Sequence, residues 1–117
     1  MKYIKTYEKI DSNIYYFIPY VDKALIIMAI KKLKTTDRTK DKILNAGFFS
    51  EIKKDTFIRD GIGLFIRIKS NGDFSYWPCD KNNTKTKAID HYNSSGFVYG
   101  GKVELEDWEI AANKYNL

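Results

Sequence analysis

Cysteine, histidine and proline are all scarce in this chain of 117 residues. Cys79 is the only cysteine and His91 the only histidine, so no disulfide bond can form within the chain. One cysteine and one histidine also fall short of the ligand set of a structural zinc site. A chain without disulfides fits a reducing compartment, and we expect a cytoplasmic protein.

The motifs of the common enzyme classes are missing as well. The aspartates do not follow the spacing of an EF-hand loop, and neither a Walker A loop nor a dinucleotide-binding glycine pattern occurs. The residues around His91 do not suggest a catalytic triad, and no helix N-terminus lies clearly beside Cys79 to activate its thiol. We therefore predict a non-enzymatic protein with no metal ion and no cofactor.

Long apolar segments are a further absence. The longest apolar run without a charge, NIYYFIPYV at residues 13–21, contains a proline and is far too short to span a bilayer. Residues 1–13 carry charges throughout and lack the apolar centre of a signal peptide. These features predict no contact with a membrane.

The composition predicts a single globular domain over residues 1–117. Hydrophobic residues make up 44% of the chain and aromatic residues 15%, which is enough to build a core. The net charge of +5 comes from residues 1–60, where 13 Lys or Arg outnumber 8 Asp or Glu; residues 61–117 hold 7 of each. A basic half indicates a polyanionic partner. Lysine enrichment through AT-rich coding would produce the same charge without any partner.

The most regular pattern is GIGLFIRIKSNGDFSYWPCD at residues 61–80. Its aliphatic residues alternate as in a half-buried strand: Ile62, Leu64, Ile66 and Ile68. The dipeptide Asn71-Gly72 suits the two-residue loop of a type I′ turn. The sequence therefore predicts a central hairpin over residues 62–77.

Three segments are expected to be helical. Apolar residues recur at helical spacing over residues 22–34, after Asp22 as a candidate N-cap. A short helix is predicted near residues 37–46, capped by Thr36 or Thr39. A C-terminal helix near residues 106–115 has acidic residues in its first turn, where the helix dipole favours negative charge.

The remaining segments complete an α+β fold with a small, mainly antiparallel sheet. Residues 14–20 are expected to form a buried strand that ends at Pro19. Residues 48–58 are expected to supply one strand or two. Residues 78–87 are predicted as a loop, residues 88–95 are ambiguous, and Gly100-Gly101 is predicted as a turn between two short strands.

The hairpin generates the candidate site. With a two-residue loop, Arg67 faces Tyr76 and Lys69 faces Phe74, so that these four side chains share one face with Phe65. Three rings interleaved with two cations suit single-stranded nucleic acid or a nucleotide-like anion, because bases stack on rings and cations meet phosphates. The candidate ligand-binding residues are Phe65, Arg67, Lys69, Phe74 and Tyr76, with Lys31, Lys32, Lys34 and Arg38 as an electrostatic flank.

The same combination of rings and cations on one face of the hairpin is also expected where no ligand binds. This face could be the solvated side of a sheet, a surface covered by a helix, or a dimer contact. A second functional hypothesis is a protein-binding inhibitor, immunity or anti-defence protein of a phage or other mobile element. Abundant tyrosine supports it, and it predicts an exposed aromatic patch or an acidic surface at residues 104–109. The sequence does not determine the oligomeric state.

Overall fold

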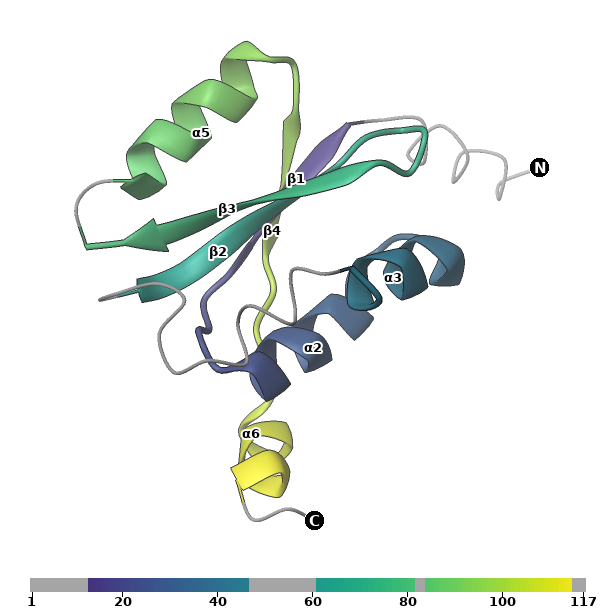
Figure 1. The fold of residues 1–117 in the computed structure, drawn as a ribbon. Coiled ribbons are helices and arrows are strands. Elements are labelled where there is room, and N and C mark those ends of the chain that lie inside the picture. The colour runs from purple at the N-terminus through teal and green to yellow at the C-terminus, as the bar shows by residue number, and fades with distance from the viewer. Residues whose placement is uncertain (1–12, 47–60, 82–83, 115–117) are drawn as a thin grey trace.

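The computed structural model describes residues 13–46, 61–81 and 84–114 (Figure 1). In chain order its elements are β1 (Ile14–Ile18), α2 (Lys23–Lys31), α3 (Asp37–Leu44), β2 (Gly61–Ile68), β3 (Phe74–Asp80), α5 (Thr84–Ser94), β4 (Val98–Lys102) and α6 (Asp107–Lys114). The predicted α+β class is confirmed. The strands expected at residues 48–58 lie outside the described residues.

The four strands form one sheet in the order β3-β2-β1-β4. Strand β2 is antiparallel to both β1 and β3, whereas β4 is parallel to β1, so the sheet is mixed. Helices α2 and α3 lie on one face of the sheet and α5 lies on the other, while α6 lies beyond α2 (Figure 1). The molecule therefore has three layers with the sheet in the middle.

Each face of the sheet has its own hydrophobic core. On the face of α2 and α3, the buried residues are Tyr16, Ile18, Ile26, Ala29, Ile30, Leu33, Ile43, Leu64, Ile66 and Ile68. On the face of α5, they are Tyr15, Phe17, Phe65, Cys79, Ala88, Tyr92 and Phe97. The two middle strands contribute to both cores, and this double burial fixes the sheet between the helical layers.

The first two helices begin where their capping residues predict. The Asp22 carboxylate accepts a hydrogen bond from the Leu25 N–H (3.2 Å), and the Thr36 hydroxyl accepts one from the Thr39 N–H (3.1 Å). Of the two threonines considered for the second cap, Thr36 holds the position. Each cap satisfies an N–H group that has no partner within its own helix.

The hairpin forms, but its predicted pairing is wrong by one residue. The Lys69 N–H donates to the Asp73 carbonyl (2.7 Å) and the Gly72 N–H donates to the Lys69 carbonyl (2.9 Å). Gly72 has a φ of 95°, as in a three-residue loop that ends on a left-handed residue. The Asn71 side chain favours this loop, because its Oδ1 accepts a hydrogen bond from the Asp73 N–H (2.9 Å).

The longer loop exchanges the faces of β3. Arg67 lies opposite Ser75 instead of Tyr76, and Ile66 lies opposite Tyr76 instead of Trp77. The side-chain period of a strand is two residues, so a shift of one residue turns every β3 side chain to the other face.

Two further segments differ from the sequence prediction. The expected loop at residues 78–87 and the ambiguous residues after it contain the end of β3 and helix α5. Gly100-Gly101 does not turn the chain but lies inside β4, beside an irregularity in the pairing with β1. A Cβ atom at Gly100 would collide with the Tyr16 ring, so glycine is required here by close packing.

No helix among the described residues is long and apolar enough to cross a membrane.

The hairpin loop can be tested at Gly72. An alanine at this positive φ should lower the free energy of unfolding by about 1–2 kcal/mol, because an L side chain is disfavoured there. Asparagine tolerates left-handed angles better, so Gly72→Asn should cost less than Gly72→Ala. Urea titrations of the three proteins measure both differences. Equal stability of the alanine variant and the wild type would contradict the loop geometry.

Candidate functional site

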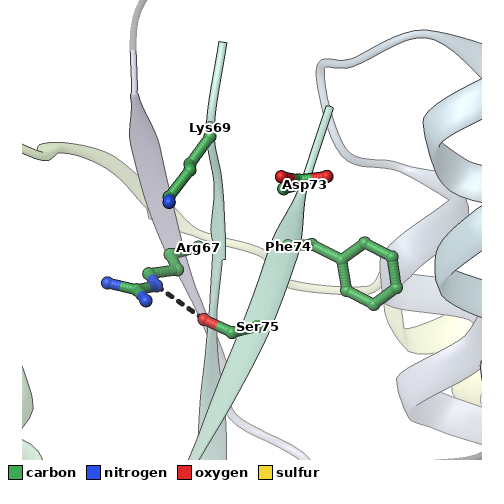
Figure 2. Close-up of a pocket in the computed structure, with 5 residues that line it drawn as sticks. All are labelled: Arg67, Lys69, Asp73, Phe74 and Ser75. Carbon is green, nitrogen blue, oxygen red and sulfur yellow. Dashed lines mark hydrogen bonds between the residues drawn. The ribbon is translucent and has the colours of Figure 1, made fainter. Parts of the chain in front are cut away.

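The predicted face of three rings and two cations does not exist in the structure. Figure 2 shows Phe74 pointing to the opposite side of the hairpin from Arg67 and Lys69. Phe74 and Tyr76 contact each other (ring centroids 5.7 Å apart) and pack against the core under α2 and α3. Phe65 does share a face with Arg67, but it is completely buried beneath α5.

The physical reason is the second helical layer. The alternation of aliphatic and other residues in β2 predicts one buried face, yet Leu64, Phe65 and Ile66 are consecutive and all fully buried. Helix α5 covers the face that was expected to be exposed, through Ala88 and Tyr92. Burial also raises the pKa of Tyr76 to about 12, consistent with a phenol removed from water.

The structure does bring Arg67 and Lys69 together. Both lie on the α5 face of β2, and they line a small hollow of about 100 Å³ with Asp73, Phe74 and Ser75 (Figure 2). A water molecule takes up roughly 30 Å³ in the liquid. The hollow therefore has room for a compact group such as one phosphate.

The Arg67 guanidinium is held in place by neutral groups. Its Nε donates a hydrogen bond to the Ser75 hydroxyl (2.5 Å). Its central carbon lies 5.1 Å from the centre of the Phe97 ring and 5.9 Å from the centre of the Tyr92 ring, within the range of cation–π attraction. No carboxylate in the described part of the chain forms an ion pair with Arg67.

Arg67 belongs to a row of side chains that crosses the sheet. Ser75, Arg67, Tyr15 and Tyr99 are neighbours on successive strands and share the α5 face. The Tyr15 hydroxyl donates to the Asn93 side-chain oxygen (2.9 Å), which ties this row to the C-terminal end of α5. The row is buried at Tyr15 and reaches solvent at Tyr99, which is 49% exposed.

The predicted lysine flank lies on the other side of the sheet. Residues Lys31, Lys32, Lys34 and Arg38 are exposed on α2, α3 and the segment between them, opposite to α5 (Figure 1). They cannot surround the same ligand group as Arg67, because the sheet separates them.

Part of the flank has structural contacts. Lys32 pairs with Glu109 (2.9 Å), which links α2 to α6 and raises the pKa of Lys32, while Lys40 donates to the Lys31 carbonyl (2.8 Å). Lys32 and Lys34 also line a hollow of about 260 Å³ with Lys102 and Glu104. The Lys102–Glu104 ion pair (3.4 Å) at its rim offsets part of that positive charge.

Three residues around Arg67 were missed by the sequence analysis: Ser75, Tyr92 and Phe97. Tyr92 lies four residues after Ala88, and this helical spacing is the sequence signal for a helix within the ambiguous residues 88–95. Ser75 follows only from the correct hairpin register. Phe97 is placed by the turn after α5, where its N–H donates to the Tyr92 carbonyl (2.9 Å).

The lone cysteine and histidine do not form a shared site. Cys79 is fully buried in the core under α5, whereas His91 is exposed with its ring 5.6 Å from that of Trp77. Among the described residues, no group of three His, Cys, Asp or Glu side chains is arranged to hold a metal ion.

Comparison with known proteins assigns no family or relative. The sequence matches no protein-family model and no curated protein, and the fold matches no solved structure. Any functional conclusion therefore depends on the geometry of the described residues.

The burial of Tyr92 predicts a loss of stability at alkaline pH. Burial raises the pKa of Tyr92 to about 12, while the Arg67 charge opposes part of that rise. The unfolded chain releases this proton above pH ~10 and the folded protein retains it. The contribution of Tyr92 to the free energy of unfolding should be fully present below pH ~10. It should fall by about 1.4 kcal/mol per pH unit between the pKa of the unfolded chain and that of the folded protein.

The substitution Tyr92→Phe isolates this contribution, because it keeps the ring and removes the titrating hydroxyl. Urea titrations at a series of pH values should show a shallower alkaline decline for the variant than for the wild type. The pKa of Tyr76 is also about 12, so Tyr76 should cause part of the alkaline loss of stability in both proteins. Identical slopes would show that Tyr92 releases its proton at an ordinary pH in the folded protein.

Proposed function

We propose that this protein binds a phosphate-bearing ligand, either a nucleotide or single-stranded nucleic acid, at the hollow beside Arg67 and Lys69. The observation that carries the proposal is the arginine itself. Ser75 and two aromatic rings orient its guanidinium, and no carboxylate of the described residues forms an ion pair with it. An oriented guanidinium favours binding because less side-chain freedom is lost when the ligand arrives.

Lys69 supplies the second positive charge. Its side chain is exposed, lies on the same face as that of Arg67, and has no carboxylate partner within the described residues. Arginine can donate two parallel hydrogen bonds to a phosphate, whereas lysine acts as a compact point charge. Together these two cations exceed the single negative charge of Asp73 in the hollow, so the hollow stays positive overall.

Charge should dominate this binding. Of the rings expected to stack on bases, Phe65 is buried in the core under α5, and Phe74 and Tyr76 are partly buried against the core on the opposite face of the sheet. The affinity should therefore fall steeply with salt concentration, as expected when cations displace the counterions of a polyanion. Fluorescence anisotropy with a labelled oligothymidylate at several salt concentrations measures this dependence.

The exposed lysine permits a test that leaves the fold intact. Lys69→Ala should weaken oligonucleotide binding and reduce the slope of log affinity against log salt by about 0.7, the value for one phosphate contact on a single strand. Lys87→Ala is the matched control, because Lys87 is equally a surface lysine but lies on α5, outside the hollow. Equal slopes for the two variants, or no binding by the wild type at low salt, would refute the proposal.

The carboxylate of Asp73 gives a prediction of opposite sign. Asp73 lines the same hollow and is held by the Asn71 side-chain amide (3.3 Å), so its negative charge opposes an incoming phosphate. Asp73→Asn should therefore tighten binding of the same oligonucleotide, by an amount that shrinks as salt increases. Weaker binding by this variant would place the phosphate elsewhere.

A protein partner is the second candidate, and α6 is the observation that favours it. Trp108 is 70% exposed, and Glu104, Glu106 and Asp107 beside it are exposed carboxylates. An accessible aromatic residue within an acidic surface is suited to a basic protein, with the ring as anchor and the charges guiding association. This surface is one of the two that the inhibitor or immunity-protein hypothesis predicts.

A capture experiment separates the two candidates. Immobilised wild type should retain a single protein from a nuclease-treated lysate, and Trp108→Ala should lose most of that retention, because aromatic anchors at interfaces often contribute about 2 kcal/mol or more. Lys69→Ala should retain the protein unchanged. Equal capture by the wild type and by Trp108→Ala would remove α6 as the contact.

A further inference from the structure

The two edges of the sheet differ in how they are protected. At the β3 edge, Pro78 lies within the strand, is exposed, and has no N–H group to offer another chain. The β4 edge contains no proline, and the side chains of its first two residues are exposed: Val98 by 59% and Tyr99 by 49%. Strand β4 is therefore the edge with the stronger capacity to accept a further strand.

The hydrogen bonds of β4 show which of its peptide groups are available. The Val98 N–H donates to the Asn13 carbonyl (2.9 Å) and the Val103 N–H donates to the Phe17 carbonyl (2.8 Å), so these residues face β1. Successive residues of a strand direct their N–H and C=O groups to alternate sides. Tyr99, the neighbour of Val98, therefore directs its N–H and C=O away from β1 and towards the edge of the described sheet.

The side chains of this edge are apolar on both faces of the sheet. Val98 lies opposite Ile14 on the face of α2, and Tyr99 lies opposite Tyr15 on the face of α5. The Tyr99 and Tyr15 rings are in contact, with their centres 5.1 Å apart. Beyond β4 the sheet has no further strand among the described residues, and exposed apolar groups on both sides of such an edge are suited to the addition of another strand.

We propose that β4 pairs with β4 of a second copy of this chain, antiparallel and about a two-fold axis at Tyr99. In that register each Tyr99 exchanges both N–H···O=C hydrogen bonds with Tyr99 of the partner subunit, and the sheet continues through both copies. Tyr99 is the residue whose peptide groups already face outward, so the pairing requires no change of the strand.

The charges of the edge are compatible with this self-pairing. With Tyr99 at the axis, Lys102 lies opposite Gly96 of the partner subunit, since 102 and 96 are both three residues from 99. Val98 lies opposite Gly100 of the partner subunit, which brings no charged side chain to the contact. The strands therefore bring no like charges together. The contact is short, because the pairing of β4 is irregular after Tyr99, and a weak dimer is expected.

Sedimentation velocity over a concentration series tests the proposal. The wild type should pass from monomer to dimer as its concentration rises. Tyr99→Lys and Tyr99→Glu should each raise the dissociation constant at least tenfold, because each places two like charges at the axis. An equimolar mixture of the two variants should recover dimers, since opposite charges then meet. Trp108→Lys is the matched control: it introduces the same charge at an exposed aromatic residue on α6 and should leave the dimer unchanged.

Circular dichroism of each variant verifies that the fold is retained. The proposal is overturned by a wild type that stays monomeric at the highest concentration, or by Tyr99 variants that dimerise as the wild type does. A mixture that fails to recover dimers excludes the two-fold arrangement. Higher oligomers that grow with concentration would indicate an open, head-to-tail contact instead of a closed pair. These outcomes are independent of oligonucleotide binding, because Lys69→Ala should dimerise normally.

Discussion

The burial of β2 on both faces is the constraint on which the rest of the structure depends. Leu64, Phe65 and Ile66 follow one another in the chain and are all removed from solvent, which requires a helical layer on each side of the sheet. Helices α2 and α3 cover one side and α5 the other. The same requirement decides which polar side chains of β2 remain near the surface, and Arg67 is positioned at the margin of the α5 layer.

Much of the fold follows from local sequence signals. The caps at Asp22 and Thr36, the alternation in β2, and the acidic start of α6 each depend on residues that are neighbours along the chain. Two features could not be derived in this way. The parallel pairing of β4 with β1 joins residues remote in sequence. The dipeptide Asn71-Gly72 suits both a two-residue and a three-residue loop, and the structure has the longer one, in which the Asn71 side chain accepts a hydrogen bond from the Asp73 N–H.

The prediction of the candidate site depends more strongly on the length of the hairpin loop than the prediction of the fold does. A one-residue difference in the loop leaves a hairpin in place but exchanges Tyr76 for Ser75 as the neighbour of Arg67. The two cations were predicted together correctly because they alternate along one strand, where the period is fixed by the backbone. The rings were predicted wrongly because their face depended on the register across two strands. The rings that do contact Arg67 come from α5 and from the turn after it.

The position of β4 affects how the chain can fold during synthesis. Strand β1 is synthesised before its parallel neighbour β4, in which Val98 lies 84 residues after its partner Ile14 (98 − 14). Contacts between such distant residues require closure of a long loop and form slowly. Until β4 has been synthesised, the side of β1 that β4 will occupy lacks the strand that pairs with it in the folded protein. The nascent protein is therefore expected to be vulnerable to misassociation and to chaperone capture along the side of β1 that β4 later covers.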